Sequence, residues 1–375
     1  MKVSKLRLIC YRNYQELNLS LSDNINIFLG MNAQGKTNIS EAVYYAAIGG
    51  SYRTNSDSDL IMWNQDGGSI AIDFQRLGVD NKLDFVFKKG HRRQILYNGH
   101  SIKGKELIGN INMVLFSPED LFLIKGAPAQ RRQFLDAEIS QASPSYYVEL
   151  MKYNKILQQR NSLLKKIKEH KASFDMLSVW DPQLANSGAK IVVKRMEAVK
   201  KLNMLANLMQ RRISGNKENL SLSYQIKGLE GDNQLNKMEK LANFLEMWYN
   251  KTLTQKAEED MWRGSTSVGP QRDDIAVQVN GIDLRAFGSQ GQQRTGVLAL
   301  KLSELEFIRS ETGEYPILLL DDVMSELDGD RRSKLLEFIR RENIQTLITA
   351  TDKAYFPNMS LGKYYHVSAG VVTEG

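Results

Sequence analysis

Alternating apolar and polar positions predict β-strands in the first quarter of the chain. Residues 6–10 and 17–21 place apolar side chains at every second position, a spacing typical of half-buried strands. The same alternation recurs at residues 70–74 and 83–87. Between the first two and the last two segments, Ile25–Leu29 is a short, mainly apolar run that predicts a buried strand.

A helical pattern replaces this alternation in the middle of the chain. From about residue 131 to residue 253, apolar side chains recur every three or four positions, which predicts a mainly helical lobe with these stripes in its core. Pro182 and Gly215 interrupt the pattern and predict helix ends. The expected helices are therefore too short to form a long coiled-coil arm.

Strand patterns return after about residue 265. Residues 275–279, 317–320 and 347–351 each read as a strand, and the last two are apolar enough to be buried on both faces. We therefore expect an α/β protein whose two ends fold together around an inserted helical lobe. The expected boundaries give an N-terminal part at 1–114, the inserted lobe at 115–264 and a C-terminal part at 265–375.

A phosphate-binding pattern follows the first buried strand. Gly30 to Thr37 read G-M-N-A-Q-G-K-T, which fits G-x-x-x-x-G-K-[ST], and a helical pattern runs from Asn38 to Ile48. Glycines let backbone N–H groups point at phosphate oxygens, and the helix start adds partial positive charge. Lys36 would reach the β- and γ-phosphates, and the Thr37 hydroxyl would bind Mg²⁺. The competing interpretation is a glycine-rich turn. The candidate nucleotide contacts are Gly30, Asn32, Gly35, Lys36, Thr37 and Asn38.

Two adjacent carboxylates could complete a nucleotide site. Asp321 and Asp322 directly follow the apolar run 317–320. A buried parallel strand delivers carboxylates to a phosphate site in this way, and neighbouring strand residues point to opposite sides. One aspartate could then hold Mg²⁺, usually through water, while the other faces the attacking water. A strand followed by an acidic turn is the alternative.

The charge balance indicates an anionic partner without identifying it. The formal net charge is +7 and the calculated pI is about 9.1, values that a mildly basic soluble enzyme could also have. Lys88 to Arg93 place four Lys or Arg residues in six positions of an expected loop, which could contact DNA phosphates or only be solvated. The single cysteine excludes a disulfide framework. No apolar stretch is long enough for a membrane span, so we expect a soluble, cytoplasmic protein.

The order of these motifs resembles the ABC-type ATPase heads of SMC and Rad50 proteins, and the RecF family of bacterial recombination and gap-repair proteins most closely. The segments that carry the closer resemblance are Cys10–Tyr14, Ser117–Asp120, Arg131–Asp136 and Gly269–Asp274, and essentially the whole chain is covered. The resemblance implies an α/β, ABC-type P-loop ATPase head with an inserted, mainly helical lobe.

The resemblance also implies roles for individual residues. ATP would join two subunits head to tail, with Ser289, Gly291 and Gln292 of one covering the γ-phosphate bound to the other. Asp321 is then the Mg²⁺-linked carboxylate, and Asp322 takes the place of the catalytic glutamate of many relatives. Arg12 and Asn13 would lie near the nucleotide, and Ser325 to Asp328 would form the D-loop at the same interface.

Two positions depart from the family pattern. Thr349–Ala350–Thr351 occupy the region where a switch histidine is usual, and no lid glutamine is evident, so Ser117–Asp120 could serve instead.

The function that the resemblance implies is an ATP-clamped dimer on duplex, gapped or junction DNA. Such a dimer would work with RecO- and RecR-type partners to help load the RecA recombinase, with weak DNA-stimulated ATP hydrolysis. A different SMC- or Rad50-type head, a transporter ATPase subunit, a P-loop small-molecule kinase with the inserted lobe as a lid, and a scaffold that binds ATP without hydrolysing it remain alternatives.

Overall fold

The computed structural model describes residues 1–229, 238–356 and 362–375 and forms two compact units. The first unit contains Met1–Asp120 and Lys301–Gly375, and the second contains Leu121–Leu300. The expected boundaries at residues 114 and 264 differ from these. The physical reason is that the strand beginning at Asp274 pairs with a strand inside the second unit, which draws residues 265–300 into it.

The first unit is built on two six-stranded sheets. One is antiparallel, in the order β2-β1-β4-β5-β6-β7, and the other is mainly parallel, in the order β15-β14-β3-β13-β12-β8. The strands of the antiparallel sheet are β1 (Lys2–Tyr11), β2 (Tyr14–Ser20), β4 (Gly67–Arg76), β5 (Val79–Lys88), β6 (Gln94–Tyr97) and β7 (His100–Ser101). Those of the mainly parallel sheet are β3 (Ile25–Leu29), β8 (Met113–Phe116), β12 (Ile317–Asp321), β13 (Thr346–Ala350), β14 (Gly362–Ser368) and β15 (Val371–Glu374).

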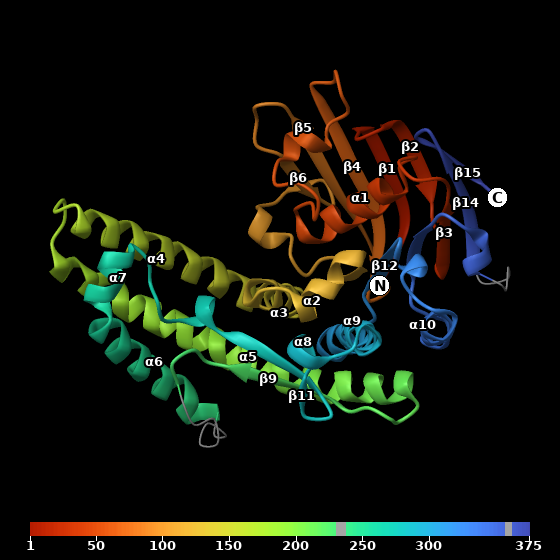
Figure 1. Cartoon of the computed structure of the whole chain (residues 1–375). Helices are drawn as coiled ribbons and strands as arrows, with labels where there is room; N and C mark the ends of the chain where they lie inside the picture. Colours follow the sequence, from red (N-terminus) through yellow and green to blue (C-terminus); the bar gives the residue numbers. More distant parts are fainter. Residues whose placement is uncertain (230–237, 357–361) are drawn as a thin grey trace. The chain divides into compact units, whose positions relative to one another are not determined.

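Helix α1 (Lys36–Ile48) joins these two sheets into one core. It contacts β4 of the antiparallel sheet and β8, β12 and β13 of the parallel sheet (Figure 1). Its buried residues Ile39, Val43 and Ala46 share a single hydrophobic cluster with residues of both sheets. Because α1 is clamped on both sides, the loop at its N-terminus starts from a fixed position. In the C-terminal segment of this unit, helix α10 (Gly329–Arg341) lies between strands β12 and β13 in the sequence.

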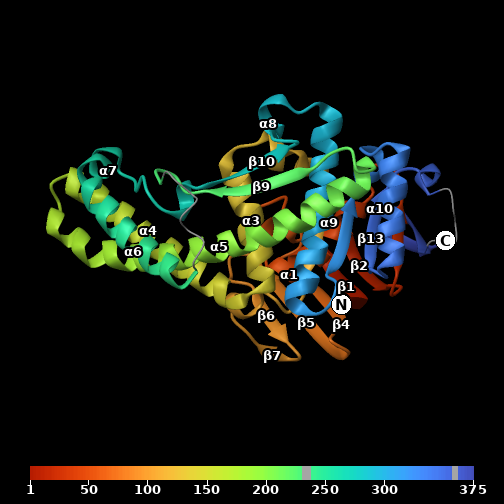
Figure 2. The same ribbon diagram turned by 90° about the horizontal axis from the view of Figure 1, so that it is seen from below.

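The second unit is mainly helical, and its long helices lie side by side (Figure 2). Its helices are α2 (Phe122–Lys125), α3 (Pro128–Ala142), α4 (Pro144–Lys168), α5 (Leu177–Ser214), α6 (Met238–Gln255), α7 (Ala257–Arg263) and α8 (Leu284–Phe287). A small sheet accompanies them, formed by β9 (Leu220–Gln225), β10 (Asp274–Val279) and β11 (Ile282–Asp283). Helix α9 (Gln290–Thr312) begins in this unit and ends in the first.

Two expectations about the helical lobe were wrong. Helix α5 is 38 residues long and continues through Pro182. This proline is only the sixth residue of the helix, so it removes a single hydrogen bond near the helix start. Strand β9 lies within the segment expected to be nearly all helical. Its Leu220, Leu222 and Tyr224 are buried and alternate with exposed residues, and it pairs antiparallel with β10.

The segment Gly269–Asp274 forms a polar scaffold inside the second unit. Arg195 is almost fully buried and donates to Pro270 O at 2.6 Å and to Asp136 at 2.8 and 2.9 Å. Asp273 accepts from the Tyr224 hydroxyl at 2.7 Å. These contacts give the segment a packing role.

Among the described residues, none of the helices is long and apolar enough to cross a membrane.

Candidate nucleotide site

The phosphate-binding loop lies between β3 and α1, as the sequence predicts. Gly30 is required sterically, because a Cβ atom there would lie 2.3 Å from Val367 O. Gly35 has φ of 118°, and its added Cβ atom would lie 2.6 Å from the Asn13 side chain. Within the described parts of the chain, the backbone N–H groups of residues 33–36 have no hydrogen-bond acceptor. Unpaired donors at a helix start fit a phosphate group.

Lys36 is folded back across this loop. Its Nζ donates to Gly30 O at 2.7 Å and to Met31 O at 2.8 Å. Burial lowers the pKa of Lys36, and the nearby Asp322 and Asp321 carboxylates oppose that shift. The ammonium group therefore sits at the loop mouth on two carbonyl acceptors, which phosphate oxygens could replace. Asn32, at the tip of the loop, is exposed.

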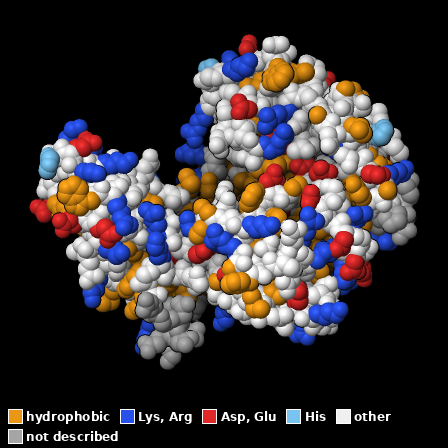
Figure 3. Space-filling view, viewed as in Figure 1, with side chains coloured by type: hydrophobic (Ala, Val, Ile, Leu, Met, Phe, Trp, Pro, Cys, Tyr) orange, Lys and Arg blue, Asp and Glu red, His pale blue; other side chains and the backbone are white. Residues whose placement is uncertain are grey.

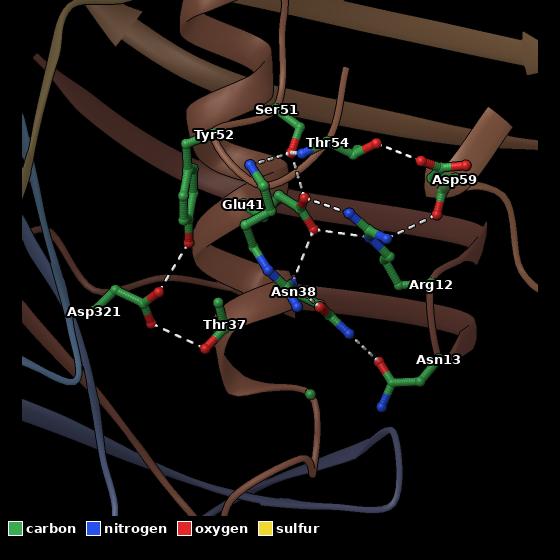
Figure 4. Close-up of polar contacts among 12 residues, drawn as sticks. Arg12, Asn13, Thr37, Asn38, Glu41, Ser51, Tyr52, Thr54, Asp59 and Asp321 are labelled. Carbon is green, nitrogen blue, oxygen red and sulfur yellow. Dashed lines mark hydrogen bonds and ion pairs between the residues drawn. The ribbon is translucent and has the colours of Figure 1, made fainter. Parts of the chain in front are cut away.

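Asp321 ends the buried strand β12 and collects three hydroxyl donors (Figure 4). Its Oδ1 accepts from Thr37 Oγ1 at 3.1 Å and from Thr349 Oγ1 at 2.7 Å. Its Oδ2 accepts from the Tyr52 hydroxyl at 2.9 Å. A hydroxyl from the first turn of α1 and a strand-end carboxylate provide the oxygen donors that Mg²⁺ prefers, so the residues fit this ion.

Asp322 lies just beyond the strand, in the left-handed conformation with φ of 55°. Strand alternation predicted that Asp322 faces away from Asp321. Because Asp322 lies outside the strand, this alternation does not apply to the pair. Its backbone N–H donates to Thr349 Oγ1 at 3.0 Å, so Thr349 links both aspartates. Burial raises the pKa of Asp322; Lys36 opposes this shift, whereas Asp321 and Glu326 add to it.

Arg12 and Asn13 come from the turn between β1 and β2, and both contact the P-loop helix or its loop. Arg12 donates to Glu41 at 2.9 and 2.6 Å, and Glu41 is fully buried on α1. Asn13 donates to Gln34 O at 3.0 Å and accepts from Asn38 Nδ2 at 2.7 Å. Both side chains thus brace the phosphate-binding loop, and their contact with a nucleotide stays a prediction.

The segment Ser51–Arg53 belongs to the site, although sequence reasoning missed it. Ser51 Oγ donates to Glu41 at 2.5 Å, and Arg53 donates to Asn38 Oδ1 at 2.7 Å. Tyr52, between them, reaches Asp321. No periodicity or motif marks these three residues. The one signal that could have found them is their place directly after Gly49 and Gly50, which end α1.

Ser289 and Gln292 form a capping box at the start of α9. Ser289 Oγ accepts from the Gln292 N–H at 3.2 Å, and Gln292 Oε1 accepts from the Ser289 N–H at 3.1 Å. Gln292 also donates to Glu218 at 3.0 Å, while Ser289 and Gly291 are exposed. These residues belong to the second unit, in which they form a capped helix start; their role toward a nucleotide stays a prediction.

Ser117–Asp120 closes the end of β8. Asp120 Oδ2 accepts from the Ser117 N–H at 2.7 Å, and Lys301 Nζ lies 3.8 Å from Asp120 Oδ1. Burial raises the pKa of Asp120, and Lys301 opposes the shift. The segment is therefore a turn fixed by these contacts at the end of β8, the strand that pairs with β12. A lid role for it stays a prediction.

Comparison with known proteins places this geometry in a family. The sequence model described as "RecF/RecN/SMC N terminal domain" matches residues 2–372. The chain is 44% identical to the DNA replication and repair protein RecF of Halothermothrix orenii over 353 residues, covering 94% of this chain and 92% of that protein. It is also 44% identical to RecF of Alkaliphilus oremlandii, with 94% and 93% covered.

Solved structures agree with the sequence relatives. The structure described as the recombination mediator protein RecF with ATP in the RecFOR pathway superposes with a TM-score of 0.90 and 35% identity, covering 100% of this chain and 97% of that one. An Smc head bound to the C-winged helix domain of ScpA has a TM-score of 0.58 at 15% identity, which shows a shared fold only. The chain belongs to the RecF family, and its fold is that of an ABC-type ATPase head with an inserted, mainly helical lobe.

Proposed function

We propose that this protein is an ATP-dependent DNA-binding ATPase that acts in recombinational gap repair and replication restart. The observation that carries the proposal is the P-loop with unpaired N–H groups, next to a Thr37 hydroxyl that already contacts Asp321 at 3.1 Å. The family relatives are named DNA replication and repair proteins, and one solved relative is described with ATP. Each relative is covered almost completely by this chain.

The residues of the first unit account for binding and for hydrolysis. The N–H groups of residues 33–36 and the Lys36 ammonium would hold the phosphates. Thr37 directly and Asp321 through water would hold Mg²⁺, which supplies charge neutralisation during phosphoryl transfer. Asp322 would accept a proton from the attacking water at its carboxylate. An aspartate is shorter than the glutamate of many relatives and leaves more room for water, so we expect slow turnover.

ATP would act between two copies of the chain. Ser289 and Gly291 are exposed at the start of the 23-residue helix α9, where partial positive charge gathers. In a head-to-tail dimer, this end of one copy would cover the γ-phosphate held at Lys36 of the other. Hydrolysis would then remove the group that joins the copies and release them.

DNA is the anionic partner that the surface of the first unit favours. Lys88, Lys89 and Arg92 are exposed where β5 ends, whereas Arg93 is ion-paired with Asp57. Figure 3 shows Lys or Arg, His and hydrophobic side chains, with Asp or Glu among them, at the upper end of this unit, where β4 begins and β5 ends. Contacts of this kind read the phosphate backbone, so we expect preference for DNA structure rather than for sequence.

An exposed tryptophan lies in a turn that is hydrogen-bonded to the segment of these cations. The Trp63 side chain is 91% exposed in the turn that precedes β4. That turn is held by the Gln65 N–H to Met62 O at 3.1 Å, and the Lys89 N–H donates to Asp66 O at 2.9 Å. Aromatic rings beside cations stack on unpaired bases, so the pair of features favours gapped or junction DNA over continuous duplex.

The proposed partners follow from the family. One solved relative is described as a recombination mediator protein in the RecFOR pathway, which supports RecO- and RecR-type partners and an indirect link to RecA. We place the protein in the cytoplasm, where these reactions occur.

Molecular mass measured by light scattering tests the proposal, with ATP, with ADP and without nucleotide, each with and without gapped DNA. We expect a dimer only with ATP, and phosphate release that DNA accelerates. A protein that stays monomeric under all conditions and does not respond to DNA would contradict the proposal and favour a small-molecule kinase. If ATP causes dimerisation but no phosphate is released, and Asp322→Asn does not alter the dimerisation, the protein would be a scaffold that binds ATP without hydrolysing it.

A further inference from the structure

Tyr52 contacts the oxygen of Asp321 that the two threonines leave free. Its hydroxyl lies 2.9 Å from Oδ2, whereas Thr37 and Thr349 contact Oδ1 (Figure 4). A carboxylate on a single Cβ rotates easily about its last bond, which turns its plane. Donors on both oxygens therefore limit this rotation and fix the plane of the Asp321 carboxylate.

The Tyr52 ring is held in place by its surroundings. It packs edge-on against Tyr44 of α1, with ring centroids 5.1 Å apart and an interplanar angle of 78°. Burial, followed by the charge of Asp321, raises the pKa of Tyr52 well above its ordinary value, so the phenol remains a proton donor at neutral pH. The hydrogen bond therefore points from the hydroxyl to the carboxylate throughout the working range.

Both chain neighbours of Tyr52 are tethered to the P-loop helix. Ser51 donates to Glu41 at 2.5 Å, and Arg53 donates to Asn38 at 2.7 Å and to Glu41 at 3.3 Å. Glu41 has no exposed side-chain surface, so this anchor lies in the rigid core. The backbone that carries Tyr52 is thus fixed at the residue before it and at the residue after it.

We propose that Tyr52 is a positioning residue for ATP hydrolysis: by donating to Oδ2 of Asp321, it fixes the plane of the carboxylate so that Oδ1 stays directed at Thr37 and the metal position. The inference rests on the proposed ATPase function. Without the hydroxyl, Oδ2 is left in a buried place with no donor among the described residues, and the plane of the carboxylate can turn away from Thr37. A metal-linked group that is misplaced by about 1 Å slows a reaction by roughly a hundredfold.

Tyr52→Phe tests this role, with Tyr45→Phe as its matched control. The Tyr45 hydroxyl also donates to an aspartate, Asp57 at 2.7 Å, but away from Asp321. We expect Tyr52→Phe to lower kcat by about tenfold or more and to raise the Mg²⁺ concentration for half-maximal rate. ATP binding measured without Mg²⁺ should stay within about twofold of wild type. Tyr45→Phe should lower Tm and leave kcat and the Mg²⁺ dependence unchanged.

The outcomes separate this inference from the proposed function. A folded Tyr52→Phe protein with wild-type kcat and Mg²⁺ dependence overturns the positioning role, and so does an equal loss in Tyr45→Phe. If wild type itself releases no phosphate from ATP, the proposed function fails instead. Should Tyr52→Phe not fold, 4-fluorophenylalanine at position 52 replaces it: this residue keeps the ring and nearly the volume of tyrosine but carries no donor, so kcat must fall, and an unchanged kcat contradicts the role.

Discussion

The Arg12 guanidinium binds both carboxylate oxygens of Glu41, at 2.9 and 2.6 Å, and Glu41 has no exposed side-chain surface. The pair joins the turn after β1 to the middle of α1 across the core of the first unit. A third Arg12 contact, to Asp59 O at 2.8 Å, extends the link to the segment that follows Tyr52. These contacts give Arg12 a scaffold role behind the phosphate-binding loop, and the contact with a nucleotide that the resemblance implies stays a prediction.

Arg12→Ala should therefore destabilise the fold. Removing Arg12 leaves the buried Glu41 carboxylate with the Ser51 hydroxyl and the half-exposed Arg53, and a broken buried pair costs about 3–5 kcal/mol of unfolding free energy. Urea unfolding measures the loss. Arg53→Ala is the matched variant, because Arg53 meets the same carboxylate at 3.3 Å but its side chain is 42% exposed, so its loss should be smaller. Equal stability of both variants and wild type would refute the scaffold role.

The salt dependence of DNA binding should identify the cations that meet phosphate. Lys88→Ala, Lys89→Ala and Arg92→Ala are each expected to reduce the slope of log affinity against log salt concentration by about 1. Arg93→Ala should change the slope less, because Arg93 is already ion-paired with Asp57 at 3.2 Å. Fluorescence anisotropy on one DNA at several salt concentrations gives the slopes. Identical slopes for all four variants and wild type would remove this loop from the interface.

Trp63→Ala should weaken binding to DNA that carries unpaired bases. Stacking of one base on an aromatic ring contributes about 1–3 kcal/mol, which corresponds to roughly a fivefold or greater loss of affinity for a gapped substrate. Continuous duplex should bind as before, since its bases are not available for stacking. Trp262→Ala is a suitable control, because that tryptophan is also exposed, at 63%, but lies in the second unit. An equal loss on duplex and gapped DNA would argue against stacking.

Asp328 should make stability depend on pH. Its side chain caps α10 by accepting from the Arg331 N–H at 2.9 Å, and this hydrogen bond lowers the pKa of Asp328 below its ordinary value of 3.8. A lowered pKa means that the folded state favours the carboxylate. The stabilisation is present above pH 3.8 and is lost as pH falls through the folded pKa.

Asp328→Ala should accordingly cost about 1 kcal/mol at pH 7 and progressively less below about pH 4. Asp328→Asn retains an acceptor at the cap and should lose less at neutral pH. Urea unfolding at several pH values provides the comparison. A wild-type advantage over Asp328→Ala that stays constant from neutral pH to about pH 3 would contradict this expectation.

Sequence patterns predicted the features that depend on neighbouring residues. The P-loop needs only a strand, two glycines and a helix in succession, so its eight-residue pattern can be recognised in the sequence alone. The strand that carries Asp321 is likewise marked by the apolar run before it. Apolar periodicity also predicted the two α/β ends and the inserted helical lobe, and the family resemblance identified the whole as an ABC-type ATPase head.

Features that depend on distant residues were not predictable. Tyr52 meets Asp321 across 269 positions of the chain, and no local pattern records that pairing. Strand β9 was missed because it is a six-residue segment between long helices, and its partner β10 begins about 50 positions later. The break expected at Pro182 failed because a proline's cost depends on its place within the helix, which the pattern around it did not reveal.

If each nucleotide is held by Lys36 of one copy and Ser289 of another, mixing two inactive variants tests that sharing most directly. Lys36→Ala and Ser289→Arg should each abolish ATP hydrolysis alone. Mixed dimers would keep one intact site of two, so an equimolar mixture should recover roughly a quarter of wild-type phosphate release. In the control, wild type mixed with the double variant forms mixed dimers without an intact site, so release should fall to about a quarter rather than half. No recovery in the first mixture, from variants that still form dimers, would show that both residues act within one chain.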